Sequence, residues 1–164
     1  MNSLFMKSSA VLSPCGLYRY RLDRVWDETL PPVCWVMLNP STADADADDP
    51  TIRRCMGFAE RWGYGGNRVV NVYALRSADP KRLWEAGDPV GPENDQSIID
   101  ACAGERTIVA WCTNAKLDRV KAVLSLLAPN ALMVECLVVT KNGHPKHPLY
   151  VRGDVKPVAF SLAN

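Results

Sequence analysis

Val33–Leu38 reads VCWVML, and the polar stretch NPSTADADADD follows it directly as Asn39–Asp49. A short, continuous apolar run of this kind suits a β-strand that is covered on both faces. Pro50 then stands where a helix can begin, because proline is tolerated at the first helical position. Asp48 and Asp49 precede it, and a carboxylate there can accept hydrogen bonds from the free backbone N–H groups. A buried strand, a polar loop and a helix in this order predict an α/β fold.

Three further apolar runs repeat this pattern along the chain. They are Arg68–Ala74 (RVVNVYA), Thr107–Cys112 (TIVAWC) and Met133–Val139 (MVECLVV). Helical patterns separate the runs: the first begins at Pro50, and the others cover Asn94–Ala103 and Asn114–Leu127. Strands that alternate with helices form mainly parallel sheets through right-handed crossovers. We therefore predict a three-layer α/β sandwich around a central, mainly parallel four-stranded sheet.

The N-terminal part adds an antiparallel strand to this prediction. Gly16–Trp26 (GLYRYRLDRVW) alternates apolar and charged residues, which is typical of a half-exposed strand. Neither an internal repeat nor a change in composition divides the chain, so we expect one domain over residues 1–164. Hydrophobic residues make up 48% and charged residues 23%, which is usual for a globular chain and argues against a disordered or fibrous protein.

Charge and cysteine content restrict the partners and the compartment. The chain has 19 Lys and Arg against 18 Asp and Glu, so bulk charge does not favour nucleic-acid binding, which would need a local basic patch. The six cysteines form no CxxC pair and several lie in apolar runs, which predicts reduced thiols and a cytoplasmic protein. Residues 1–10 lack the features of a signal peptide, and no apolar run reaches the roughly 20 residues of a membrane-spanning helix. We therefore expect no membrane association.

Two polar loops follow predicted buried strands, Asn39–Asp49 and Lys141–Tyr150. Ligands of parallel α/β sheets bind beyond the carboxyl ends of the strands, so we expect the two loops to form one site. In the first loop, Pro40 restricts Asn39 to an extended conformation, which fixes an amide that can donate and accept hydrogen bonds. Further candidates there are the hydroxyl groups of Ser41 and Thr42 and the carboxylates of Asp44 and Asp49. The alternative is a solvated acidic loop that caps the next helix.

The second loop contains the only two histidines of the chain, His144 and His147, and each precedes a proline. Histidines on a stiff loop, with Tyr150 nearby, suit hydrogen bonding to an anionic or carbonyl oxygen. A purely structural loop is the alternative. The HPKHP spacing offers no further zinc ligands, and the acidic loop lacks the glycine and the terminal glutamate of a calcium loop. We therefore expect neither a metal nor another cofactor.

Two polar residues lie between these loops. Asn71 stands inside an apolar strand, where a buried amide needs hydrogen-bond partners. Arg76 follows the end of the same strand and is a candidate for contact with a phosphate or a carboxylate. Each has an ordinary alternative, since Asn71 could tie down neighbouring backbone and Arg76 could be a surface charge.

Several motifs together resemble a family of bacterial and phage proteins that is described as a domain of unknown function. They are LNPSTAD, DPTIRRC, NVYALR, DPVGPEND and GHPKHPLYV, and the resemblance covers about Leu30–Val151. The order of elements is also similar to that of the uracil-DNA glycosylase superfamily. VMLNPS matches the first strand-end motif of that superfamily, VVNVYALR the second strand, TIVAWCTNA the third strand and VVTKNGHPKHPLY the last loop.

The second resemblance implies roles for particular side chains. Asn39 would position the attacking water, and Asn71 would read the edge of the base. His147, or else His144, would stabilise the departing base as an anion, because a fixed donor aimed at an oxygen that gains charge acts electrostatically. The nucleotide would have to leave its stack to reach such a site. The resemblance thus implies an N-glycosylase that acts on a nucleobase in DNA or on a nucleotide.

Two other functions fit the same residues. A non-catalytic protein could keep the pocket in order to bind a nucleotide, a nucleic acid or another protein. A different hydrolase could use Asp44 or Asp49 as a general base together with His147. Metal dependence would favour the hydrolase, and tight binding without turnover would favour the binding protein. The sequence does not predict the oligomeric state.

Overall fold

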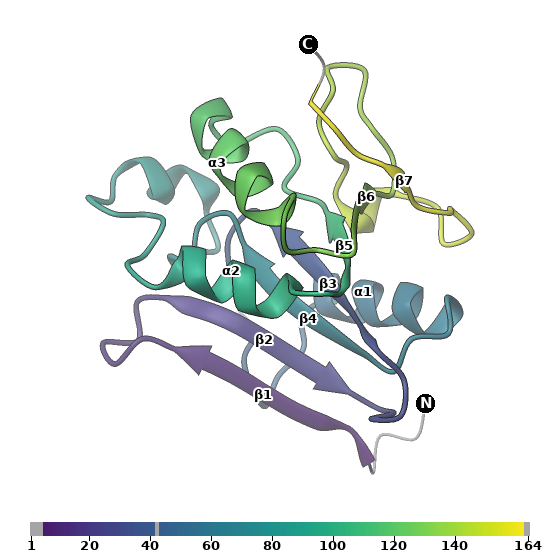
Figure 1. Cartoon of the computed structure of the whole chain (residues 1–164). Helices are drawn as coiled ribbons and strands as arrows, with labels where there is room; N and C mark the ends of the chain where they lie inside the picture. Colours follow the sequence, from purple (N-terminus) through teal and green to yellow (C-terminus); the bar gives the residue numbers. More distant parts are fainter. Residues whose placement is uncertain (1–4, 42, 163–164) are drawn as a thin grey trace.

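The computed structural model describes residues 5–41 and 43–162 and has an α/β fold. Within these residues, one seven-stranded mixed sheet has the order β1-β2-β4-β3-β5-β6-β7 and is flanked by three α-helices (Figure 1). The strands are β1 (Lys7–Leu12), β2 (Arg19–Val25), β3 (Pro32–Met37), β4 (Gly66–Asn71), β5 (Arg106–Val109), β6 (Met133–Cys136) and β7 (Val158–Ala159). The helices are α1 (Pro50–Arg61), α2 (Asn94–Cys102) and α3 (Leu117–Leu127), with short 3₁₀ helices η2 (Pro80–Trp84) and η3 (Pro148–Tyr150). No helix in the described part of the chain is long and apolar enough to cross a membrane.

The four predicted apolar runs correspond to β3, β4, β5 and β6, which are parallel neighbours in the order β4-β3-β5-β6. The prediction of a four-stranded sheet is only partly right, because antiparallel strands extend this sheet at both edges. β2 is the predicted N-terminal strand, whereas no sequence pattern indicates β1 or β7. The reason is that β1 (KSSAVL) is mostly exposed and β7 has only two residues, so neither carries an apolar run.

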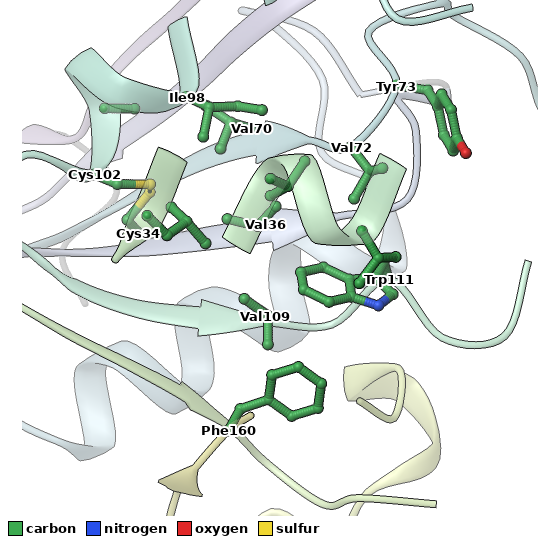
Figure 2. Packing of buried hydrophobic residues seen from close by; sticks show 14 of the residues in the cluster. Cys34, Val36, Val70, Val72, Tyr73, Ile98, Cys102, Val109, Trp111 and Phe160 are labelled. Carbon is green, nitrogen blue, oxygen red and sulfur yellow. Dashed lines mark hydrogen bonds between the residues drawn. The ribbon is translucent and has the colours of Figure 1, made fainter. Parts of the chain in front are cut away.

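Alternate side chains of β3 enter the two halves of the core on opposite faces of the sheet. On one face, Val36 packs in a cluster with Ile98 of α2 and Val123 of α3; Figure 2 shows Val36 and Ile98 in this half of the core. On the other face, Trp35 packs against Phe58 of α1, with ring centroids 6.2 Å apart. Helices thus cover both faces of the central strand, which explains why VCWVML is apolar throughout rather than alternating.

The apolar runs extend past the ends of the strands. β4 ends at Asn71, although RVVNVYA continues to Ala74, and both Val72 and Ala74 are buried. The backbone N–H of Val72 donates to the carbonyl oxygen of Met37 at 2.9 Å, which completes the pairing with β3, whereas that of Ala74 donates to the carbonyl oxygen of Val90 in a loop. An apolar composition indicates that a segment is buried, whereas a strand also requires regular pairing with a neighbouring strand. The predicted strand is therefore longer than the observed one.

β6 is the least buried of the four parallel strands. Met133 at its start is 44% exposed, and so is Val139, which lies beyond its end. The prediction that Met133–Val139 is a buried strand is therefore only partly right: Cys136 and Leu137 are buried, but the strand ends at Cys136 and both ends of the run are exposed. The physical reason is position, because β6 is followed only by the two-residue strand β7 at this side of the sheet.

β2 is more buried than the alternating pattern predicts. Arg19, Asp23 and Arg24 are 3%, 8% and 2% exposed, so the expected half-exposed strand is wrong. β2 is an interior strand between β1 and β4. The arginine side chains of β2 donate hydrogen bonds to backbone carbonyl groups of the acidic loop, Asn39–Asp49. These hydrogen bonds replace those that an exposed arginine would make with water.

The helix starts show where capping can and cannot be predicted. α1 begins at Pro50, and Oδ1 of Asp49 accepts a hydrogen bond from Ile52 N at 2.9 Å, as the sequence predicts. α3 begins at Leu117 rather than at Asn114, and its N-cap residue, Lys116, makes no capping hydrogen bond through its side chain. The backbone N–H of Lys116 instead donates to the hydroxyl group of Tyr73 at 3.1 Å, a contact from a distant part of the chain.

The six cysteines should all carry free thiols in the native protein. All six are free in the structure, and the Sγ atoms of Cys34 and Cys102 approach to 2.8 Å (Figure 2). Burial, with the Cys102 thiol adding to it, raises the pKa of Cys34 above its usual value, and the protonated thiol is a poor nucleophile. Mass spectrometry of the unreduced protein should therefore give the full reduced mass. A native deficit of two protons that maps to one cysteine pair would contradict this.

Candidate functional site

A cavity of about 310 Å³ opens at the carboxyl ends of the parallel strands. Its walls come from the ends of β3 and β4, from the residues after β5, from the start of α1 and from η3. The volume lies at the lower end of the range of small-molecule pockets, about 300–1,000 Å³. This is the edge of the sheet at which parallel α/β proteins bind their ligands.

The cavity brings together most of the residues that the sequence singled out. Six of them line it: Asn39, Ser41, Asp49, Asn71, His147 and Tyr150. Three do not, namely Asp44, Arg76 and His144. Thr42 lies outside the described residues. The two polar loops therefore meet in one pocket, although they lie far apart in the sequence.

Asn71 is the last residue of β4 and is only 1% exposed. Neither Nδ2 nor Oδ1 of its side chain has a hydrogen-bond partner among the described residues. Leaving a buried polar group unpaired costs about 1–3 kcal/mol, so such groups are rare in folded proteins. Its backbone is held in place, because Nδ2 of Asn94 donates to the carbonyl oxygens of Asn71 at 2.9 Å and of Val72 at 3.3 Å. The pocket wall thus contains a fixed amide with a free donor and a free acceptor.

Asn39 is oriented by the loop that follows β4. Its Nδ2 donates to the carbonyl oxygens of Pro40 at 3.0 Å and of Ser77 at 2.9 Å, with a longer contact of 3.5 Å to that of Leu75. Because the nitrogen is engaged, the amide cannot rotate freely. Oδ1 accepts no hydrogen bond from any residue that the structure describes, so it is available to a water molecule or a ligand.

His147 precedes η3, and its Nδ1 accepts a hydrogen bond from the backbone N–H of Leu149 at 3.2 Å. A ring nitrogen that accepts a hydrogen bond carries no proton, so the neutral ring carries its proton on Nε2. Burial lowers the pKa of His147 below its usual value, and the charge of Asp49 raises it to a smaller extent. The imidazole is therefore a neutral donor at pH 7. The ring of Tyr150, which is 71% exposed, lies 5.6 Å from the His147 ring.

His144 lies elsewhere. It lines a second cavity of about 170 Å³ together with Phe160 and Trp111. Its backbone N–H donates to Oγ1 of Thr140 at 3.1 Å, and its carbonyl oxygen accepts from Thr140 N at 2.7 Å, which places it in a tight turn. Of the two histidines that the sequence offers, only His147 shares the pocket with Asn39.

The carboxylates of Asp44 and Asp49 accept hydrogen bonds from groups close to them in the sequence. Asp49 caps α1 with Oδ1, and its Oδ2 accepts from the hydroxyl group of Ser41 at 3.0 Å. Oδ1 of Asp44 accepts from the backbone N–H groups of Asp46 and Ala47, both at 2.8 Å, and these bonds lower the pKa of Asp44. Within residues 5–41 and 43–162, no three His, Cys, Asp or Glu side chains gather as metal ligands would.

Arg19 is a pocket residue that sequence reasoning missed. It is 3% exposed, and its Nη1 donates to the carbonyl oxygen of Ala43. Arg19 and Leu22 are an odd number of positions apart, so a regular strand would place them on opposite faces. A register shift between β1 and β2 leaves Tyr20 unpaired, and both side chains then lie on the α1 side of the sheet with Ile52. A bulge that depends on a partner strand leaves no signal in the local sequence.

Cys112 is a second residue of the pocket that the sequence did not indicate. Its φ angle is 63°, and it is the only residue other than glycine with a positive φ among those described. Its backbone N–H donates to the carbonyl oxygen of Pro145 at 3.0 Å, which joins the end of the third predicted strand to the histidine loop. Backbone strain of this kind clusters at functional sites.

The fold and the cavity define an α/β protein with a ligand-sized pocket at the carboxyl edge of its parallel strands. The model of a protein family of unknown function, DUF1643, matches residues 19–149, and the chain belongs to this family. The matched range begins at Arg19 and includes Asn39, Asn71 and His147. Neither a curated protein nor a solved structure matches the chain.

Proposed function

We propose that this pocket binds a nucleobase, free or within a nucleotide or nucleic acid, and hydrolyses its N-glycosidic bond. The observation that carries the proposal is the unpaired amide of Asn71 in the pocket wall. An amide offers one acceptor and a donor group side by side, which is the complement of a base edge with its adjacent N–H and C=O groups. A bound base would satisfy the two polar atoms that the fold leaves without partners.

Asn39 and His147 would act on the two sides of the N-glycosidic bond, Asn39 at the sugar carbon and His147 at the base. Oδ1 of Asn39 would accept a hydrogen bond from the water molecule that attacks the sugar carbon. As the C–N bond breaks, its electron pair would leave with the base, and Nε2–H of His147 would donate a hydrogen bond to the base oxygen that gains this charge. The proton lost by the attacking water would end on the base anion, so that the products are the free base and a sugar hydroxyl group. Because the pKa of His147 is lowered by burial, the ring would serve as a neutral donor without first losing a proton.

The test is release of a free base from a panel of substrates. Purified protein is incubated with single- and double-stranded DNA and RNA that carry normal or deaminated bases, and with nucleosides and mononucleotides. Chromatography of the small-molecule fraction should detect a free base from at least one of them. No release from any member of the panel by folded protein would contradict the catalytic part of the proposal.

A non-catalytic binding protein is the second candidate, and one observation favours it. Met37 and Leu38 line the pocket directly before Asn39. The glycosylases that the chain resembles place a glycine in this position, which lets the base approach closely. Side chains here narrow the approach, so a base could bind without reaching the geometry of reaction. Tight binding of a base or nucleotide with no release would support this candidate.

A further inference from the structure

We propose that Arg19 forms an anion subsite in the same pocket, so that the ligand carries a phosphate group. The binding of a base rests on the proposed function, whereas the binding of a phosphate group does not. An experiment can therefore reject one of the two and leave the other standing. The subsite would take the phosphate of a free mononucleotide or one phosphate of a strand, since both present the same anionic oxygens.

Arg19 is a buried cation with which no carboxylate forms an ion pair among the described residues. It is 3% exposed, and its one side-chain hydrogen bond to these residues runs from Nη1 to the carbonyl oxygen of Ala43. Its Nε has no partner there. Burying a charge is costly unless it is paired, so an unpaired guanidinium in a pocket wall indicates a missing anion.

The neighbouring Arg24 shows what a satisfied arginine looks like on the same strand. It is 2% exposed, and its Nε donates to Oδ1 of Asp48 at 2.8 Å. Its Nη2 donates to the carbonyl oxygens of Asp44 and Ala47, and its Nη1 to that of Asp23. Arg24 does not line the pocket. The two arginines hold the same loop, but only the one that faces the pocket lacks a counter-ion.

The charges around Arg19 leave room for an anion. Burial lowers the pKa of Arg19 to about 10 and Asp49 raises it, so the group is protonated at neutral pH. The charges of Asp49 and, more weakly, Asp44 act on it, but the carboxylates of both residues already accept hydrogen bonds from neighbouring groups. Arg76 lies close enough for its charge to act on Arg19, and it too has no ion pair among the described residues. A planar guanidinium group can bind a phosphate group in a bidentate manner, through two parallel hydrogen bonds.

The test compares binding with and without the phosphate. Titration calorimetry is performed with 2′-fluoro-2′-deoxynucleosides of each common base, which resist N-glycosidic hydrolysis, with their 5′-monophosphates and with inorganic phosphate. For the wild-type protein, the preferred monophosphate should bind about 10–100-fold more tightly than its nucleoside, the effect of charge-assisted hydrogen bonds. Arg19→Gln should remove this preference and leave nucleoside affinity within a few fold. Arg24→Gln, the matched control, should lower the melting temperature and keep the preference.

The outcomes separate the two proposals. Equal affinities of wild-type protein for nucleoside and monophosphate would overturn the subsite and leave the base pocket standing. Binding of inorganic phosphate that Arg19→Gln abolishes, with no binding of any nucleoside or nucleotide, would support the subsite and remove the proposed function. If Arg19→Gln does not fold, Arg19→Lys replaces it: this variant should keep part of the preference, and complete loss in the folded variant would count against a charge effect. A trinucleotide that binds more tightly than the monophosphate would assign the subsite to a strand phosphate.

Discussion

Replacing Asn71 with leucine should stabilise the protein and abolish ligand binding at the same time. Leucine has the same branched arrangement of heavy atoms in its side chain, and the change removes two buried polar atoms that have no hydrogen-bond partners among the described residues. We expect the free energy of unfolding to rise by about 1–3 kcal/mol, the cost of an unsatisfied buried polar group. Urea denaturation measures this change, and calorimetry with nucleosides and nucleotides measures the loss of binding.

Asn94 provides the matched control for this substitution. It is as buried as Asn71, but its Nδ2 donates to the carbonyl oxygens of Asn71 and Val72. Asn94→Leu should therefore lower the free energy of unfolding, opposite in sign to Asn71→Leu. If Asn71→Leu destabilised the protein as much as Asn94→Leu does, the side chain of Asn71 would have a structural role, and the argument for base recognition would fail.

Truncating His147 to alanine should reduce the rate of base release by about 10²–10³-fold, the usual loss for one donor to a developing anion. The fold should persist, because the side chain lies in a loop at the pocket and belongs to neither half of the core. Single-turnover release of the base measures the rate, and circular dichroism checks the fold. An unchanged rate in the folded variant would refute the catalytic role.

His144→Ala is the control, since this histidine lines a different cavity and its truncation should leave the rate within a few fold.

The pH dependence of the rate adds an independent measurement. In the proposed mechanism the neutral ring is the active form, and burial lowers the pKa of His147. The rate should therefore be steady down to about pH 6.5, the usual pKa of histidine, and should fall only below it.

The central fold could be predicted because VCWVML and the runs of β4 and β5 are buried between helices, and a strand that is buried on both faces has a continuously apolar sequence. The strand ends could not, because Val72 and Ala74 are as apolar as the strand before them but lie beyond Asn71, the last residue that pairs with β3. The edge strands β1 and β7 could not be predicted, for the opposite reason. They are paired but mostly exposed, so their sequences carry no apolar signal.

The candidate site could be predicted in part from one topological rule. Asn39, Asn71 and His147 follow or end parallel strands, and such strands deliver their loops to one edge of the sheet. The rule does not distinguish His144 from His147, because the turn at Thr140 decides which one reaches the pocket. It also could not reveal Arg19, whose direction depends on a register shift against β1.

The way in which β2 holds the acidic loop bears on how this pocket could diversify. Arg19 and Arg24 donate four hydrogen bonds to the described residues of this loop. Those to residues 43, 44 and 47 go to backbone carbonyl oxygens, and among these four only that to Asp48 reaches a side chain. Any amino acid supplies a carbonyl oxygen. The shape of the loop is therefore largely independent of the side chains it displays, and substitutions along it could alter the choice of ligand while the chain path stays the same.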